Sequence, residues 1–448
     1  MVASKVFSAD YVVRRILKHF SWLLGGQVFI AIANFGYLGL TAHSLGVESF
    51  GRLVLVKTYI EVIAGLTTFQ SWQALIHYGA GFLQHQNRKA FQHLIKLTTL
   101  LDGLGALAGF LIAVMAAPYI GSFVGWNDAA IHEVQRFSIL ILFTLESTPT
   151  GLLRLYDRFD RLAFQRAIPP IIRLFGTIIV VALHTPLWGY LLAWLIAEAF
   201  NGPLLLLLGW QEAKKQDVLK DMDWSCPNLA RSDPKILRFC LVSNLNSSLP
   251  LTIAISPLII GFFANPVTVG LFRAGYELST PLRDLALLLT QSVYPELTRL
   301  SSQKNWKKFS TILLKIGASL NFTGVLLFIL CLVLGREILH YSMGETFIPA
   351  YTTLIVLVIA GIFKMGNCLL EPALYAMELP HISLRVNAIA ILVVYLPLLM
   401  ALTYQFGAVG AGLATLLSSA LSFILNSLLT WKQLHLRRKF AKSIFVSV

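Results

Sequence analysis

The chain has 448 residues, of which 56% are hydrophobic and only 13% are charged, and its formal net charge is +14. Because a soluble domain carries about a quarter charged residues, this composition excludes a soluble enzyme, a disordered scaffold and a nucleic-acid-binding module. The surplus apolar surface is expected to face membrane lipids, which are the first partners that the sequence predicts.

Charge-poor runs long enough to cross a bilayer as helices follow one another along the chain. Six of them lie at 20–45, 51–76, 97–119, 134–153, 167–184 and 187–209. Six more lie at 239–263, 268–295, 310–334, 350–374, 384–405 and 407–430. The sequence therefore predicts an all-α polytopic membrane protein with about twelve transmembrane helices. Its predicted domains are a six-helix lobe at 1–209, a polar cytoplasmic linker at 210–237, and a second six-helix lobe with a basic tail at 238–448.

Lysine and arginine are distributed unevenly between the two sides of this topology. With a cytoplasmic N-terminus, the inner segments hold 27 of the 36 Lys and Arg residues and the outer segments hold three. This asymmetry is the positive-inside pattern, which explains the positive net charge without a nucleic-acid partner. Both termini are therefore predicted to be cytoplasmic.

Motifs of enzymes and metal proteins are missing from the sequence. No HExxH, GxSxG or P-loop pattern occurs, and the four cysteines form no CxxC pair. The predicted outer loops are also too short to hold an exported active site. We therefore expect no catalytic residues, no metal site and no cofactor.

The two halves of the chain share a short pattern. Arg15-Ile16-Leu17-Lys18 precedes the first apolar run, and Lys235-Ile236-Leu237-Arg238 precedes the seventh. Gly51 follows Ile16 by 35 residues, and Gly270 follows Ile236 by 34. Parallel repeats of this kind are a common transporter plan, in which the substrate path lies between the halves.

Each of these glycines opens a run that carries a base and an acid four residues apart. Ionisable groups in hydrocarbon cost at least ~2.5–3.5 kcal/mol each, so they usually face a bundle interior or a watery cavity. The eighth run has a polar stripe about 60° wide. Its members are Arg273, Glu277, Thr280, Asp284 and Gln291. The second run repeats the pattern with Lys57 and Glu61, so the two runs are predicted to border a hydrated lumen, unless the paired charges only hold helices together.

Three acids are candidates for ion coupling, namely Asp102, Glu61 and Glu277. Asp102 lies six residues into the third run, where it could bind a proton or a sodium ion. It could equally partner Lys57 or a buried hydroxyl, and both readings stay open. Lys364 and Glu371 share a face of the tenth run, and the same alternatives apply to them.

Several short segments are similar to those of one protein family. They are Leu23-Leu24-Gly25-Gly26-Gln27, Leu45–Gly51, Phe69–Gly79, Leu152–Asp160 and Tyr294-Pro295-Glu296-Leu297. With these motifs the chain resembles the polysaccharide transporters, the Wzx-type flippases of the multidrug and oligosaccharidyl-lipid exporter superfamily. The resemblance implies a MATE-like fold, in which two six-helix lobes form a V around a central hydrated lumen.

The same resemblance implies a function and partners. It implies that the protein moves an undecaprenyl-diphosphate-linked oligosaccharide repeat unit across the bacterial inner membrane, as in O-antigen and lipopolysaccharide biosynthesis. Polysaccharide polymerase and chain-length proteins are the partners it suggests. Lys57, Arg273, Arg283 and Lys364 could then meet the diphosphate, while hydroxyls and amides of the stripe could bind sugars.

Two rival functions remain on the sequence. A cation-coupled multidrug exporter of the same superfamily would need a cavity dominated by acids and lined by aromatic side chains. A lipid II-type flippase usually carries further helices beyond twelve. A glycan polymerase or ligase is excluded, because it would need a large outer loop.

Overall fold

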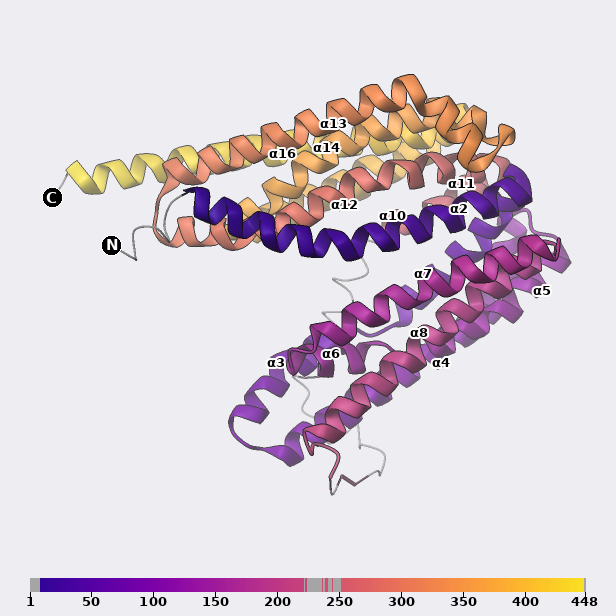
Figure 1. Ribbon diagram of the computed structural model, residues 1–448, viewed down its shortest axis with the longest axis horizontal. Coiled ribbons are helices and arrows are strands. Elements are labelled where there is room, and N and C mark those ends of the chain that lie inside the picture. The colour runs from indigo at the N-terminus through magenta and orange to yellow at the C-terminus, as the bar shows by residue number, and fades with distance from the viewer. Residues whose placement is uncertain are drawn as a thin grey trace. The chain divides into compact units, whose positions relative to one another are not determined.

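The computed structural model describes the backbone of residues 9–220, 222, 223, 236, 238–240, 244 and 251–446. Within these ranges, the side chains of 9–29, 281–285, 288, 289, 291, 292, 295 and 439–446 lie outside the description. Helices are the only regular elements of the described residues (Figure 1). The predicted all-α class is therefore confirmed.

The first half of the chain forms eight helical elements up to residue 215. They are α2 (Ala9–Thr67), α3 (Ser71–Gln84), α4 (Arg88–Val124), α5 (Asp128–Phe137), the 3-10 helix η1 (Ser138–Phe143), α6 (Ser147–Leu155), α7 (Phe159–Ala182) and α8 (Leu187–Lys215). Because α8 continues to Lys215, the first residues of the predicted linker are helical. Most of the remaining linker lies outside the described residues.

The second half begins, in its described part, at residue 251. Its elements are α10 (Leu251–Ala254), α11 (Ser256–Phe263), α12 (Pro266–Ser302), α13 (Trp306–Met343), η3 (Glu345–Ala350), α14 (Tyr351–Ala376), α15 (Pro380–Ala388), the π-helical η4 (Ile389–Tyr395) and α16 (Leu396–Val446). The predicted seventh run at 239–263 is described only at 239, 240, 244 and from 251 onward.

Seven helical stretches of the described chain are long and apolar enough to cross a membrane. Two of them each contain two predicted runs joined by a glycine kink, at Gly46 in α2 and at Gly407 in α16. Both glycines have positive φ, 70° and 56°. Side chains with a Cβ avoid this region, so glycine lets the chain turn there without a loop.

Two of the predicted runs are interrupted, so their description as single helices is wrong. The run at 51–76 breaks at residues 68–70, between α2 and α3. The run at 134–153 is divided into α5, η1 and α6, with residues 144–146 outside any helix. The breaks fall at Thr68-Phe69-Gln70 and at Thr144-Leu145-Glu146, which are short polar stretches between apolar residues. A hydropathy window of about 19 residues averages over such stretches, so it does not reveal them.

The described chain divides into two compact units. Unit 1 comprises 1–32, 46–51 and 266–448, and unit 2 comprises 33–45 and 52–265. In unit 1, α14 packs against both α12 and α16 and buries Leu354, Leu357 and Val358. In unit 2, a core of buried residues from α3, α4 and α6 includes Leu75, Ile95 and Leu152. The predicted lobe boundaries at 209 and 238 stay a prediction.

The outer faces of the helices are apolar, as a lipid-facing protein requires. Along α13 the exposed large side chains include Phe322, Val325, Leu326, Ile329 and Val333. In water such a continuous apolar face would promote aggregation, whereas hydrocarbon solvates it. The protein is therefore a polytopic membrane protein.

Candidate functional site

The predicted pair on α2 is an ion pair that lies beside a tryptophan. Lys57 Nζ is 3.6 Å from Glu61 Oε1, and the two side chains are 18% and 50% exposed. The same Nζ lies 5.8 Å from the centroid of the buried Trp194 ring on α8. A cation over an aromatic face is attracted by the ring quadrupole, so Lys57 has two stabilising neighbours. Both members of the pair remain partly accessible.

The corresponding pair on α12 has a richer cationic environment. Arg273 and Glu277 form an ion pair one turn apart, and each side chain is about a quarter exposed. The Arg273 guanidinium lies 5.8 Å and Lys364 Nζ 5.7 Å from the centroid of the Tyr276 ring. Two cations from α12 and α14 thus converge on one aromatic side chain in unit 1.

The rest of the predicted stripe on α12 is only partly described. The Thr280 hydroxyl donates to the Glu277 carbonyl of its own helix at 2.7 Å, so it stabilises α12 locally. The side chains of Arg283, Asp284 and Gln291 lie outside the described residues. Their membership of a lumen face stays a prediction.

Asp102 lies in unit 2 beside the first residues of α3 and α6, the two helices that begin after the interrupted runs. Its Oδ2 accepts the backbone N–H of Thr148 at 2.8 Å and the Thr148 hydroxyl at 2.7 Å. Thr148 is the second residue of α6, and Glu146, which precedes this helix, provides no side-chain cap. The Asp102 carboxylate therefore acts as an N-cap supplied by another helix. Of the partners considered for Asp102, the structure supplies the buried hydroxyl, while Lys57 pairs with Glu61.

The start of α3 is capped in the same manner. The backbone N–H of Trp72, the second residue of α3, donates to Ser147 Oγ at 3.0 Å. Two further buried oxygens at this junction, Asp102 Oδ1 and Ser71 Oγ, do not meet the geometry of an ordinary hydrogen bond, although the Ser71 hydroxyl lies close enough to stabilise the Asp102 carboxylate. The junction thus holds one carboxylate oxygen that is satisfied twice and one that is not.

A second polar cluster in unit 2 joins α6, α7 and α8. The Asn201 amide donates to Glu146 Oε1 at 2.6 Å, and the Gln165 amide donates to Asn201 Oδ1. One turn before Asn201, Glu198 forms an ion pair with Arg173. We assigned none of these residues a role from the sequence. The signal that could have revealed them is the occurrence of Glu146, Glu198 and Asn201 within the fourth and sixth apolar runs and of Arg173 within the fifth.

Glu371 belongs to an amide–hydroxyl network of unit 1. Its Oε1 accepts hydrogen bonds from Asn387 at 2.8 Å and from Asn367 at 3.2 Å. Ser422 donates to Asn387 Oδ1, and Asn426 donates to Asn367 Oδ1. Lys364 and Glu371 therefore have different described neighbours, the Tyr276 ring and this network.

The two glycines that mark the internal repeat meet in unit 1. A methyl group at Gly51 would overlap the Pro266 carbonyl, and one at Gly270 would lie 2.5 Å from the Val47 carbonyl oxygen. These clashes mean that backbone packs directly on backbone where the two segments cross. Glycine is needed at both positions for this approach.

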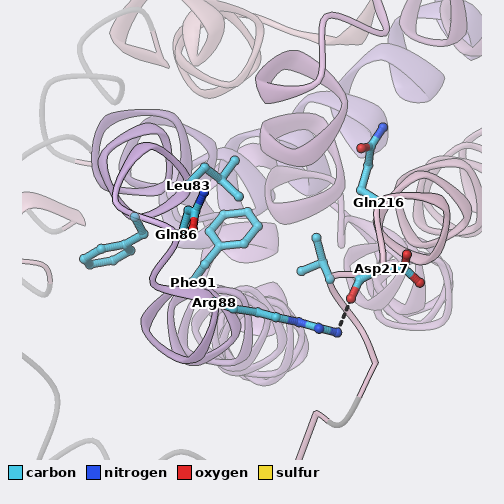
Figure 2. A pocket seen from close by; sticks show the side chains of 8 residues that line it. Leu83, Gln86, Arg88, Phe91, Gln216 and Asp217 are labelled. Atoms are coloured by element: carbon cyan, nitrogen blue, oxygen red, sulfur yellow. Dashed lines mark hydrogen bonds between the residues drawn. The ribbon is translucent and has the colours of Figure 1, made fainter.

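A depression of ≈260 Å³ lies beside the first residues after α8 (Figure 2). The Arg88 guanidinium crosses toward the segment that follows α8 and donates to the carbonyls of Asp217 and Lys220. The buried Gln92 amide donates to the Val218 carbonyl at 2.7 Å. These bonds fix the start of the predicted linker onto α4 and use the donors that a ligand would need.

Comparisons with known proteins agree with this architecture. Residues 16–301 match the model of the family described as "Polysaccharide biosynthesis protein". The inner membrane protein YghQ of Escherichia coli K12 is 24% identical over 350 residues, which cover 78% of this chain and 98% of YghQ. The probable low-salt glycan biosynthesis flippase Agl15 of Haloferax volcanii is 24% identical over 169 residues, 38% of this chain and 36% of its own.

A solved structure confirms the predicted fold type. An inward-facing multidrug resistance MATE family transporter of the MOP superfamily superposes with a TM-score of 0.72 at 12% identity. The superposition covers 92% of this chain and 96% of the transporter. At this identity the likeness establishes the fold alone, which is MATE-like as predicted.

Proposed function

The chain belongs to the polysaccharide biosynthesis protein family, and from this premise we propose that it is a flippase of lipid-linked glycans. The cargo we propose is an undecaprenyl-diphosphate-linked oligosaccharide repeat unit. The protein would carry it from the inner to the outer leaflet of the bacterial inner membrane, with both of its own termini in the cytoplasm. No catalytic step and no cofactor is part of this proposal.

The observation that carries the proposal is the convergence of Arg273 and Lys364 on Tyr276, next to Glu277. A cargo diphosphate has several anionic oxygens, which arginine binds in a bidentate manner and lysine as a point charge. In unit 2, Lys57 lies at the corresponding place of the repeat and is also partly accessible. Arg273 and Lys57 each have a neighbouring acid, Glu277 and Glu61, with which they can pair again when the diphosphate leaves.

Ion coupling is the second part of the proposal, and we place it at Asp102. The other two candidate acids, Glu61 and Glu277, already form ion pairs with Lys57 and Arg273. Asp102 instead lies in a buried, polar junction, where its described neighbours are the Thr148 amide and hydroxyl and the Ser71 hydroxyl rather than a base. Intramembrane acids of this kind often carry protons or cations in transporters.

The multidrug exporter is the alternative that differs most in chemistry. A cationic drug would be repelled by Arg273 and Lys364, which both lie beside the Tyr276 ring, whereas an anionic diphosphate would be attracted by them. A lipid II-type flippase differs only in the sugars of its cargo, so the identity of the accumulated lipid decides that case. Polymerase and chain-length proteins would act on the exported unit as partners in the same membrane.

The test is deletion of the gene in its native host with the upstream glycosyltransferases intact. We expect one diphosphate-linked oligosaccharide to accumulate in the inner leaflet, protected from reagents added outside the cell. Complementation with the wild-type gene should restore its export, and Arg273→Gln should restore it poorly at equal protein level. Unchanged lipid intermediates together with new sensitivity to cationic drugs would overturn the proposal in favour of the exporter.

A further inference from the structure

Unit 2 contains a polar cavity of ≈240 Å³ that the proposed diphosphate contacts do not use. It lies where α6, α7 and α8 meet. Its polar lining consists of Glu146, Thr150, Gln165, Arg166 and Asn201, and its apolar lining includes Leu162 and Leu205. A few directional groups on an apolar wall are typical of a site that fixes the orientation of a small ligand.

The amide groups of this cavity are held in one orientation. Gln165 donates to Asn201, and Asn201 donates to Glu146, so each side chain positions the next. These hydrogen bonds use only Oε1 of Glu146. Its other carboxylate oxygen forms no hydrogen bond with a described residue and is available as an acceptor. The second amide hydrogens of Gln165 and Asn201 remain donors. The cavity therefore presents donors and acceptors in fixed positions.

Arg166 adds a cation that the protein itself leaves unused. Its side chain is exposed, and it forms no hydrogen bond or ion pair with a described residue. Arg166 and Glu146 line the same cavity, yet no ion pair within 4.0 Å joins them. If Arg166 and Glu146 served only to stabilise the fold, we would expect them to form an ion pair, since opposite charges in contact stabilise one another.

We propose that this cavity binds one uncharged sugar ring of the cargo's glycan head group. The inference rests on the proposed function, and it names the chemistry of a second cargo contact, separate from the diphosphate. A sugar hydroxyl donates one hydrogen bond and accepts others, which matches a lining that alternates donors and acceptors. The volume is of the order of a single sugar ring, and Leu162 and Leu205 can cover its C–H face.

The charge balance of the cavity favours a neutral ring over a diphosphate. The residues that line the cavity include one base, Arg166, and one acid, Glu146, so a diphosphate would meet little net positive charge there. A lipid tail does not fit this cavity, because it would bury the Arg166 guanidinium and the remaining donors and acceptors of the lining against hydrocarbon.

The test is binding to the full-length protein in lipid nanodiscs. The first probe is the oligosaccharide released by mild acid from the lipid that accumulates in the deletion strain, and the second is inorganic pyrophosphate. Thr150→Val and Arg166→Gln each remove hydrogen-bonding groups from the cavity. Each should weaken oligosaccharide binding roughly tenfold and leave pyrophosphate binding unchanged. Thr177→Val is the matched control, since Thr177 is buried on α7 outside the cavity lining.

The outcomes separate this inference from the proposed function. If wild-type protein restores export and both cavity variants bind the oligosaccharide as tightly as Thr177→Val, the sugar site is refuted and the flippase stands. If Arg166→Gln loses pyrophosphate instead of oligosaccharide, the cavity is a phosphate site and the inference is also refuted. If deletion produces no glycan lipid to release, the proposed function fails and this inference fails with it.

Discussion

Replacing Asp102 with leucine should destabilise unit 2 more than any single loss of an intrahelical hydroxyl bond. The change removes both hydrogen bonds that Asp102 Oδ2 accepts from Thr148, which is almost completely buried. Leaving a buried donor unsatisfied costs about 1–3 kcal/mol, so the two together predict a loss of roughly 2–6 kcal/mol. The start of α6 would lose its cap in the same step.

The matched control for this substitution is Thr98→Val on the same helix. Thr98 is also fully buried, but its hydroxyl donates only to the Ile95 carbonyl of α4, at 3.0 Å. Its loss should cost about 0.5–1.5 kcal/mol. Unfolding of the purified variants in mild detergent, followed by tryptophan fluorescence during titration with a denaturing detergent, measures both. Equal stabilities of Asp102→Leu and Thr98→Val would refute the role of Asp102 as a cap.

Asp102→Asn separates the structural role from ion coupling. Asparagine keeps one acceptor oxygen for the two Thr148 donors, so we expect its stability to lie within about 1 kcal/mol of wild type. It cannot exchange a proton or neutralise a cation as the carboxylate does. A stable Asp102→Asn protein that no longer exports glycan lipid would support coupling at this residue, and full export would place Asp102 among structural residues only.

The remaining predictions concern the glycines and the cationic cluster. Gly46→Ala and Gly407→Ala should each lower the free energy of unfolding by about 1–3 kcal/mol in the same assay, because both glycines have positive φ. Wild-type stability of both variants would show that these positions do not require glycine. Gly270→Leu should abolish export by separating the backbones that cross at Gly51, whereas Gly81→Ala, which meets nothing within 4 Å, should export normally. Arg273→Lys should export the lipid better than Arg273→Gln, since lysine keeps the charge but not the bidentate geometry, and equal export by both would argue against a diphosphate contact.

The positions of most spans could be predicted because they depend on length and hydropathy alone. The pairs Lys57–Glu61 and Arg273–Glu277 could also be predicted, since residues four apart on a helix are neighbours in any fold. The breaks before α3 and α6 could not, because a long hydropathy window averages over the few polar residues there and the side chains that cap the new helix starts come from distant positions. Thr148 is 46 residues from Asp102, and hydropathy does not reveal which helix faces meet.

The same limit explains which site residues were missed. Glu146 and Asn201 lie 55 residues apart and become neighbours only through the packing of α6 on α8. A single sequence does not show which residues of α6 lie opposite which residues of α8. For the same reason the contact of Lys364 with Tyr276 could not be predicted, because the two residues lie on different helices.

The kinks at Gly46 and Gly407 limit how the orientation of this protein can be mapped experimentally. A reporter or epitope inserted at either corner would interrupt continuous helical backbone rather than extend a loop. The corners that can accept an insertion are those with backbone outside helices, at Gly125–Asn127 after α4 and at Gly344 after α13. Tags placed there should be labelled by reagents added outside the cell if the predicted outer face is right. An unlabelled tag at Gly46 would not inform on the topology, because the insertion itself disrupts the helix.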